Sequence, residues 1–320
     1  MIRAGRVFAA AAGCVLGAAL AFAGTAAAAT EVVIGISGWT GFAPLTLAKE
    51  AGIFEKNGLD VTIKKIPQKD RHLAIAAGDI QCAATTVETY IIWNANGVPV
   101  TQIFQLDKSY GADGMAVRSD IDSFADLKGR TIAAGTPGTA PYFLLAWMLA
   151  KNGLSVKDVT IASLDAGPAA QAFIAGQNDA AMTYEPYLSN VRNRPETGKI
   201  LATTLDYPVV MDTFGCTPDF LEAHPDAAKA LTESYFQALD MIADDREKAY
   251  GIMGADVRQT AEQFGQSASY LRWQDRAANK AFFDGTIQQF SKEAADLLLS
   301  LGIIRKIPDL DAIVDPRFVQ

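Results

Sequence analysis

Residues 126–161 read DLKGRTIAAGTPGTAPYFLLAWMLAKNGLSVKDVTI and contain one complete supersecondary unit. Two short apolar runs, at 131–134 and 159–164, have the composition of buried strands. Between them, an apolar period over about 141–152 predicts a helix, which Gly153 closes. A strand, a helix and a second strand in this order predict two parallel strands joined by a crossover helix.

The same alternation continues on both sides of this unit. Helical periods follow most of the other strand-like runs, and after Pro218 the apolar spacing stays helical almost to the end of the chain. This pattern predicts two α/β units, the first with a mainly parallel sheet, and a helical C-terminal part. In such folds a ligand binds at the carboxyl ends of strands and the N-termini of helices. The other predicted strands are 32–37, 61–66, 82–84, 100–104, 114–117, 180–183, 200–203 and 209–214.

The composition is typical of a globular protein and argues against several functions. Of the 320 residues, 50% are hydrophobic and 20% are charged, with 28 Lys and Arg against 36 Asp and Glu. A net charge of −8 without a basic cluster argues against nucleic acid as a partner, because Lys and Arg hold phosphate backbones. Two histidines and three cysteines leave little material for metal sites or His-dependent catalysis. We therefore expect no nucleic-acid partner, no cofactor and no metal.

The N-terminal residues 1–29 have the pattern of a secretory signal peptide. Arg3 and Arg6 precede an apolar run at 7–22, which passes into a tract rich in alanine. We expect cleavage near Ala28 or Ala29 and export to the periplasm. A membrane anchor is the alternative, but the apolar run is short for a span of roughly 20 residues.

The cysteines leave one question open. Cys14 falls within the apolar run and suggests a lipoprotein, but the residues before it lack the usual Leu and a lipid anchor is not expected. After cleavage Cys82 and Cys216 remain. They could pair in an oxidising compartment, or they could be two buried thiols in strand-like surroundings.

Polar loops that follow the predicted strands supply the candidate site. The common catalytic motifs are missing: there is no GxSxG, GxxxxGK[ST] or HExxH, and His72 and His224 are expected to have surface or structural roles. Hydroxyl, carboxyl and free N–H groups at helix starts can form a small polar site, although each of them could also be a simple helix cap. The candidate ligand-binding residues are Trp39, Thr86, Glu88, Asp113, Thr136, Thr139, Tyr184, Glu185 and Asp212.

Three ordered motifs resemble a known family. PLTLAKEAGIFEKNGLDVTI at 44–63, the segment 126–161 and AFIAGQNDAAMTYEPYLS at 172–189 are similar to the solute-binding proteins of nitrate/sulfonate/taurine-type ABC importers. The resemblance implies a type II periplasmic-binding-protein fold, with two α/β lobes joined by two crossovers near Val117 and Asp212. Lobe I would then comprise 30–116 and 212–320, and lobe II 117–211. It also implies a monomer that closes around a small molecule and delivers it to a permease and its ATPase.

The carboxylates at the candidate loops point to a donor-rich ligand. Glu88, Asp113, Glu185 and Asp212 lie at these loops, and Lys108 is the one basic residue near them. A guanidinium suits such a site, because it forms paired N–H···O bonds with carboxylate. Its face could stack on aromatic rings. The candidate rings are Trp39, Phe42, Tyr142 and Tyr184.

A narrower resemblance points the same way. The motifs GWTGFAPLTLAKEAG, IPQKDRHLAIAAGD, CAATTVETY and LDKSYGADGM are similar to a branch of the family associated with urea- or guanidine-carboxylating pathways. It implies a ligand of the guanidine or urea type. Several alternatives stay open. The ligand could be an alkanesulfonate, taurine or nitrate, with Glu88 and Asp212 as helix caps or inter-lobe ion pairs. A pyrimidine-precursor synthase and the effector domain of a transcription regulator share the fold, and both are remote alternatives.

Overall fold

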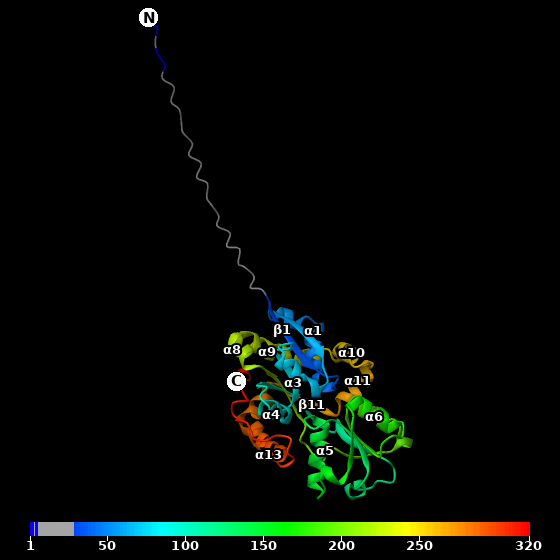
Figure 1. Ribbon diagram of the computed structural model, residues 1–320. Coiled ribbons are helices and arrows are strands. Elements are labelled where there is room, and N and C mark those ends of the chain that lie inside the picture. The colour runs from blue at the N-terminus through cyan, green and yellow to red at the C-terminus, as the bar shows by residue number, and fades with distance from the viewer. Residues whose placement is uncertain (3, 6–28) are drawn as a thin grey trace.

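The computed structural model describes residues 1–2, 4–5 and 29–320. Most of the predicted signal peptide, including Cys14 and Ala28, lies outside the described residues. The described part contains two β-sheets, each at the centre of one lobe. In Figure 1 the green middle of the chain forms the lobe at the lower right. The other lobe includes β1 (Thr30–Ile36), which lies above it, and α13 (Ile287–Ser300), which lies to its left. Among the described residues, no helix combines the length and the apolar character needed to span a membrane.

The first lobe is built on a mixed six-stranded sheet with the order β11-β4-β10-β3-β1-β2. β1 pairs in parallel with β2 and β3, whereas β10 is antiparallel to β3 and β4, and β11 is antiparallel to β4. The prediction of a mainly parallel sheet is therefore wrong, because β10 returns from the other lobe and enters the sheet in the opposite direction. The strands other than β1 are β2 (Leu59–Lys65), β3 (Cys82–Thr86), β4 (Thr101–Ser109), β10 (Met211–Cys216) and β11 (Leu271–Trp273).

The second lobe has a five-stranded sheet with the order β7-β6-β8-β5-β9. The segment 126–161 folds as predicted: β6 and β7 are parallel, and α5 (Ala140–Lys151) connects them. β5 is antiparallel to both β8 and β9. The strands are β5 (Asp113–Val117), β6 (Thr131–Ala134), β7 (Thr160–Ser163), β8 (Ala180–Tyr184) and β9 (Lys199–Thr203).

The chain crosses between the lobes twice, at 110–112 and at 204–210. The boundary expected after residue 116 falls inside β5, which pairs with strands of the second sheet, whereas the boundary expected before Asp212 lies at the start of β10. Periodicity identifies 114–117 as a strand but does not indicate which sheet the strand joins. The two crossovers are tied together: Ser109 Oγ and Thr204 Oγ1 are 2.6 Å apart, and the backbone N–H of Gly111 donates to Thr204 Oγ1 at 2.8 Å.

The helices surround the two sheets. In the first lobe α9 and α10 pack against α1, and α13 packs against α4. β11 interrupts the C-terminal region that the sequence predicted to be helical. The first lobe contains α1 (Ala43–Glu50), α2 (Ile53–Lys56), α3 (Gln68–Ala76), α4 (Val87–Ala95), α8 (Pro218–Ala223), α9 (Pro225–Asp244), α10 (Arg246–Asp256), α11 (Ala261–Ala268), α12 (Arg276–Ala281) and α13 (Ile287–Ser300); the second contains α5, α6 (Ala166–Ile174) and α7 (Tyr187–Arg192).

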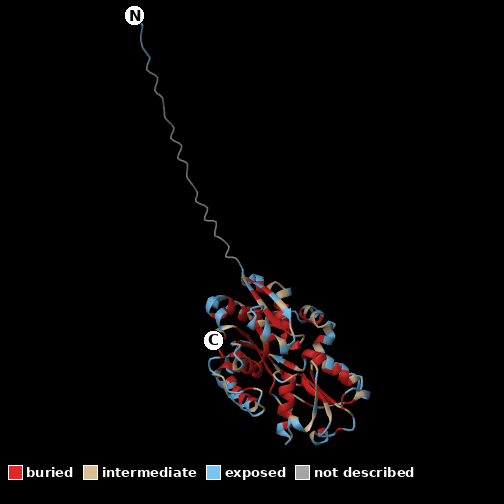
Figure 2. Cartoon of the chain, in the orientation of Figure 1, coloured by how far each residue is buried: buried red, intermediate tan, exposed pale blue. Residues whose placement is uncertain are grey.

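Burial follows the strands and continues across the junction of the lobes (Figure 2). β3 is buried along its whole length, and its small side chains let α4 and β10 lie close to it. Gly215 in β10 shows how close this packing is: a Cβ there would lie 2.9 Å from the carbonyl oxygen of Thr101 and 3.0 Å from the Tyr90 ring. The inner ends of these strands are thus held rigidly beside the second lobe.

Cys82 and Cys216 form a disulfide. They lie opposite each other in the antiparallel pair of β3 and β10, with their Cα atoms 4.0 Å apart. Of the two possibilities that the sequence left open, the structure has the paired one. The bond joins the first half of lobe I to the strand that returns from lobe II.

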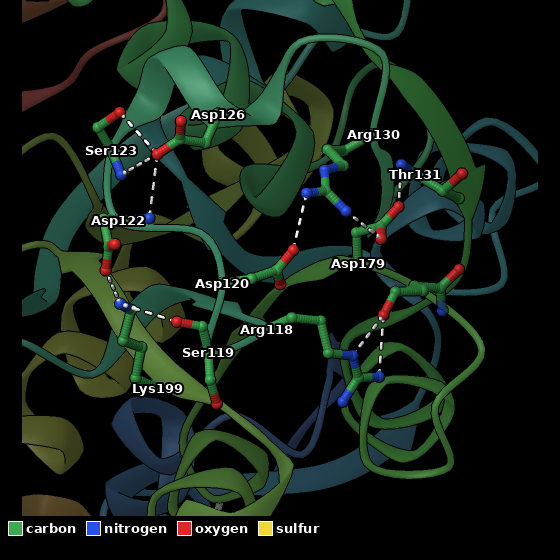
Figure 3. A network of polar contacts seen from close by, with 11 residues as sticks. Arg118, Ser119, Asp120, Asp122, Ser123, Asp126, Arg130, Thr131, Asp179 and Lys199 are labelled. Atoms are coloured by element: carbon green, nitrogen blue, oxygen red, sulfur yellow. Dashed lines mark hydrogen bonds and ion pairs between the residues drawn. The ribbon is translucent and has the colours of Figure 1, made fainter.

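Figure 3 shows a polar network at the end of β5 that is remote from Asp113. The Arg118 guanidinium donates to the carbonyl oxygens of Phe173, Asn178 and Thr197, and it lies 4.0 Å from the centre of the Phe173 ring. Nearby, Arg130 contacts the carboxylates of Asp120 and Asp179, at 2.8 and 3.3 Å. These contacts close the C-terminal end of α6 and make the far side of the second lobe rigid.

Candidate functional site

Strand ends from both sheets meet between the lobes. Thr86 ends β3 and Tyr184 ends β8, whereas Asp113 begins β5 and Asp212 is the second residue of β10. Trp39 follows β1 after two residues. Because β5 and β10 run antiparallel to β8 and β3, their first residues lie next to the last residues of those strands. The fold therefore places these five side chains at one junction.

Two connected spaces lie at this junction. The inner cavity is small, with a volume of about 20 Å³, and the outer cleft beside it has a volume of about 260 Å³. Ser37, Gln68 and Tyr184 line both spaces. The remaining side chains at the inner cavity are Trp39, Phe42, Arg71, Thr85, Thr86, Asp113, Ala140, Val210 and Asp212.

Four buried carboxyl side chains lie at or beside the inner cavity: Asp113 and Asp212 line it, whereas Asp107 and Glu88 are hydrogen-bonded to residues that line it. Glu88, Asp107, Asp113 and Asp212 are each at most 4% exposed. The indole N–H of Trp39 donates to both oxygens of Asp107, at 3.2 and 3.3 Å, and the Thr86 hydroxyl donates to Glu88 Oε1. Within the part of the chain that the structure describes, Glu88 Oε2 and Asp113 Oδ2 have no hydrogen-bond partner. Both oxygens can accept a further hydrogen bond, and Asp113 lines the inner cavity, where a ligand could donate it.

Burial makes these carboxyls hard to ionise. It raises the pKa of Glu88 to about 8 and the pKa of Asp113 to about 7. Burial and the charge of a neighbouring carboxyl hold the pKa values of Asp107 and Asp212 well above the usual value. An isolated ionised carboxylate is costly in such a place, whereas a nearby positive charge offsets that cost.

Arg71 is the one positively charged side chain among the described residues that line the inner cavity. It is 1% exposed, donates from Nε to the Ile66 carbonyl oxygen at 2.9 Å, and donates from Nη1 to the Ala84 carbonyl oxygen. Its Nη2 has no partner within the described residues. Burial lowers the Arg71 pKa to about 10, so the guanidinium stays charged at neutral pH.

Aromatic rings from both lobes form the remaining walls. Trp39 of the first lobe and Tyr184 of the second meet edge to face, with ring centres 5.4 Å apart. Phe42 also faces the inner cavity, and the Arg71 guanidinium lies 5.8 Å from the centre of its ring. Tyr142 was expected to join this group, but it lines neither the inner cavity nor the outer cleft.

The lobes touch across the cleft. The Gln68 side-chain oxygen in lobe I accepts a hydrogen bond from the Ala140 N–H in lobe II at 3.1 Å. At the mouth, Lys69 Nζ lies 3.7 Å from Asp165 Oδ2. Together with the pair of Trp39 and Tyr184, these contacts describe a closed arrangement of the two lobes.

Most of the predicted ligand-binding residues come together at this junction. Trp39, Thr86, Asp113, Tyr184 and Asp212 line the inner cavity, and Glu88 is hydrogen-bonded to Thr86 beside it. These side chains come from loops that are far apart in the sequence. Their shared position at strand ends is what the sequence analysis relied on.

Three predicted residues lie elsewhere. Thr139 lines the outer cleft, where its hydroxyl donates to the Thr136 carbonyl oxygen at 2.8 Å. Thr136 itself lines a separate groove between the lobes. Glu185 is fully buried, pairs with Arg192 and accepts a hydrogen bond from the Ser189 N–H at 3.1 Å. Its carboxylate is therefore engaged by its own helix.

Sequence reasoning missed Gln68, Arg71 and Asp107. The sequence indicates Lys108 as the one basic residue near the site and gives Arg71 no role. Lys108 instead lies 5.6 Å from the centre of the Phe282 ring. One available signal was spacing: Gln68, Arg71 and Ile75 lie three and four residues apart, which places them on one face of α3.

Metal ligation was also considered. Among the described residues, no group of three or more His, Cys, Asp or Glu side chains has the arrangement of a metal site.

A family model described as NMT1/THI5 like matches residues 39–249, which is more than half of the chain. The chain belongs to the NMT1/THI5-like family. This matched segment of the NMT1/THI5-like chain includes every predicted ligand-binding residue. Membership agrees with the broader resemblance found in the sequence, to solute-binding proteins of the nitrate/sulfonate/taurine type.

Known proteins similar to this NMT1/THI5-like chain support the same fold. The taurine-binding periplasmic protein of Escherichia coli (strain K12) is 28% identical over 233 residues, covering 69% of this chain and 69% of that protein. The alkanesulfonate-binding protein SsuA from Xanthomonas axonopodis pv. citri, bound to MOPS, superimposes with a TM-score of 0.78 at 20% identity, covering 91% of this chain and 100% of that one. The periplasmic nitrate-binding protein NrtA from Synechocystis PCC 6803 gives a TM-score of 0.73 at 19% identity, covering 89% and 85%. The predicted two-lobed periplasmic-binding-protein fold is confirmed.

Proposed function

We propose that the protein is the solute-binding component of an ABC importer and captures a small nitrogen compound of the guanidine or urea type. The observation that carries this proposal is a group of four buried carboxyls: Asp113 and Asp212, which line the inner cavity, and Glu88 and Asp107, which are hydrogen-bonded to its lining residues Thr86 and Trp39. The relatives that bind taurine, alkanesulfonate or nitrate support the general role of a binding protein. In this role the chain is an exported periplasmic monomer that delivers its ligand to a permease and an ATPase, and it is not an enzyme.

Charge favours a donor-rich ligand over an anion. An anion about 4 Å from one ionised carboxylate would be disfavoured by roughly 4 kcal/mol at an effective dielectric constant of about 20. A planar cation reverses this sign, and its N–H groups can donate to Glu88 Oε2 and Asp113 Oδ2, the oxygens that have no partner within the described residues. The carboxyl oxygens of Asp212, which lines the same cavity, are further acceptors.

Size and shape support the same class of ligand. The closed arrangement leaves about 20 Å³ in the inner cavity and about 260 Å³ in the outer cleft, so the enclosed space suits a small compound better than a peptide or a sugar. Trp39, Phe42 and Tyr184 provide ring faces and edges against which a flat cation can pack. The N–H of Ala140 at the N-terminus of α5, to which an anionic oxygen could bind, already donates to the side-chain oxygen of Gln68.

A small anion or zwitterion is the second candidate, and Arg71 favours it. The Nη2 of Arg71 has no partner within the described residues and lies at the inner cavity, where it could donate to a sulfonate or nitrate oxygen. Taurine could use both signs of charge, with its ammonium at the carboxylates and its sulfonate at Arg71. The carboxyls outnumber Arg71 at this cavity, and for this reason we rank the guanidine or urea type first.

The non-enzymatic role is proposed for chemical reasons. Cys82 and Cys216 are joined to each other, so neither offers a thiolate in this state. The buried carboxyls have a ready use in binding. Incubating the purified protein with each candidate solute, followed by mass analysis of the solute, would test this: an altered solute would overturn the proposal of a pure binding role.

Thermal-shift titration of the mature chain tests the proposed ligand class. The panel is guanidinium chloride, urea, taurine, methanesulfonate and nitrate, with guanidinium kept at or below about 1 mM so that it does not act as a denaturant. A ligand that binds only the folded protein stabilises it by RT ln(1 + [L]/Kd), so a saturable rise in Tm of several degrees is expected for guanidinium or urea. A saturable rise with methanesulfonate, taurine or nitrate alone would replace this proposal with the anion.

A further inference from the structure

Among the described residues, Gln68 alone lines all three spaces at the junction: the inner cavity, the outer cleft and the separate groove beside them. It is the first residue of α3 in lobe I. Its side-chain N–H groups donate to the Thr85 hydroxyl at 2.8 Å and to the Thr89 hydroxyl at 2.9 Å. Its side-chain oxygen accepts from the Ala140 N–H of lobe II at 3.1 Å. One amide therefore joins both lobes at the mouth of the inner cavity.

The oxygen and the N–H groups of the Gln68 amide form hydrogen bonds with different lobes. Ala140 is the first residue of α5, and the first four N–H groups of a helix have no partner inside that helix. Gln68 provides the acceptor from the opposite lobe. Thr85 and Thr89, by contrast, belong to the same lobe as Gln68, so their bonds do not depend on the lobes being closed.

We propose that Gln68 is a positioning residue that latches the closed cleft around its ligand. Opening the lobes breaks the bond to Ala140 and exposes the inner cavity, while Thr85 and Thr89 keep the amide pointed toward lobe II. The latch is therefore already oriented before closure and needs little ordering when the lobes meet. This inference rests on the proposed function, because a latch matters only to a protein that closes over a solute.

The other polar contact at the mouth is a weaker candidate for this role. Lys69 and Asp165 are 3.7 Å apart, and their side chains are 42% and 44% exposed. Ion pairs this exposed contribute little, because water screens the charges and two flexible side chains must be ordered. The Gln68 bond is shorter and partly buried.

The latch predicts a kinetic signature. Solute enters the open form, in which the bond to Ala140 is absent, so the association rate should not depend on it. Release requires the bond to break, so losing it should raise the dissociation rate by about fivefold to tenfold, the usual net effect of one hydrogen bond. A side chain that merely supported the fold would instead lower the Tm of the empty protein and leave this rate ratio unchanged.

The test compares substitutions on both sides of the bond. Gln68→Leu removes all three hydrogen bonds, and Gln68→Asn shortens the side chain so that it no longer spans the gap. Gln68→Glu keeps the acceptor for Ala140, while the two threonine hydroxyls can turn to donate. Ala140→Pro removes the donor from the other lobe at a helix position that tolerates proline. Gln289→Leu, on the exposed face of α13, is the matched control.

Stopped-flow fluorescence with guanidinium chloride measures both rates for each variant. We expect faster dissociation in Gln68→Leu, Gln68→Asn and Ala140→Pro, unchanged association, and values within about threefold of wild type for Gln289→Leu. Gln68→Glu, which keeps the acceptor and adds a carboxyl at the cavity, should dissociate no faster than wild type. The double variant Gln68→Leu/Ala140→Pro should be no worse than either single one, because both remove the same bond. Equal dissociation rates across the series, or a purely additive double variant, would overturn the latch.

The same series separates this inference from the proposed ligand. If wild-type protein binds taurine or nitrate in place of guanidinium, the proposed ligand class fails, and the dissociation rates of that solute then decide on the latch. A spin-label distance between Lys157→Cys in lobe II and Lys229→Cys in lobe I reports closure directly. If no solute of the panel binds or shortens this distance, both proposals fail.

Discussion

Guanidinium binding should weaken sharply as the pH falls, and the raised pKa of Glu88 sets the scale. A carboxyl with a pKa of about 8 in the empty closed cleft is mostly protonated at pH 7. To pair with a cation it must lose that proton, so binding releases a proton. The affinity for guanidinium is therefore highest above the raised pKa of Glu88 and decreases as the pH falls below it. Guanidinium itself does not titrate in this range, as for the arginine side chain.

The magnitude can be worked out for one carboxyl. If Glu88 alone must ionise, the observed Kd rises tenfold for each pH unit below about 8 and levels off above it. Between pH 9 and pH 6 this amounts to roughly ninetyfold, or about 2.7 kcal/mol. Asp113, with a pKa of about 7, adds to the slope below that pH if it also pairs with the ligand.

Isothermal titration calorimetry of the mature chain can measure both consequences. Kd is determined from pH 6 to pH 9, and each titration is repeated in two buffers with different ionisation enthalpies, which gives the number of protons released. The control is Glu88→Gln, which keeps the size of the side chain and cannot ionise. It should weaken binding at pH 9 by at least tenfold, since a charge-assisted bond is lost, and it should flatten the pH profile. A wild-type Kd that is independent of pH, or that improves toward pH 6, would refute this reasoning.

Three further perturbations test other parts of the structure. Arg71→Met removes the cavity's positive charge, so it should leave guanidinium binding within about tenfold of wild type but weaken any binding of taurine or nitrate much more. Calorimetry of the folded variant measures both affinities, and a larger loss for guanidinium than for the anions would favour the anion. Reducing the disulfide between Cys82 and Cys216, or replacing both residues by Ala, should cost up to about 5 kcal/mol for their sequence separation of 134, seen as a Tm lower by roughly 10 °C. Arg192→Met should cost about 3–5 kcal/mol in urea unfolding, because it leaves the fully buried Glu185 carboxylate unpaired, and an unchanged midpoint would contradict that role.

The sequence predicted what depends on local spacing. The segment 126–161 contains apolar runs of strand length around a helical period, and these runs became β6, α5 and β7 with parallel pairing. Glycines and prolines marked the ends of such elements. The same information does not specify which sheet a strand enters. The segment 114–117 reads as a strand in either lobe, and only its pairing with β8 and β9 places it in the second.

The candidate site was predictable to the extent that it lies at strand ends. Asp113 and Asp212 satisfy that rule and line the inner cavity. Glu185 also satisfies that rule, but its carboxylate forms an ion pair with Arg192, two helical turns later. The rule missed Arg71 because it lies on a helix among charged neighbours, and its burial depends on contacts with residues distant in the sequence, such as Ala84 and Phe42. Local sequence patterns do not indicate which residues contact each other across long sequence distances.

The charges that select the ligand also oppose closure of the empty cleft. With no cation present, closing the lobes at pH 8 buries the carboxyls that line the inner cavity, Asp113 and Asp212. Burial raises the pKa of both, so on closure they must either take up protons or stay ionised away from water. Opening returns them to water and removes that cost. A cation between the lobes removes it as well, and only in the closed form. A solute shifts the equilibrium between the open and closed forms only as far as its affinities for the two forms differ. Here the carboxyls provide that difference in affinity. Neutral urea satisfies hydrogen bonds but brings no charge, so at pH 8 it should close the lobes less completely than guanidinium at equal occupancy.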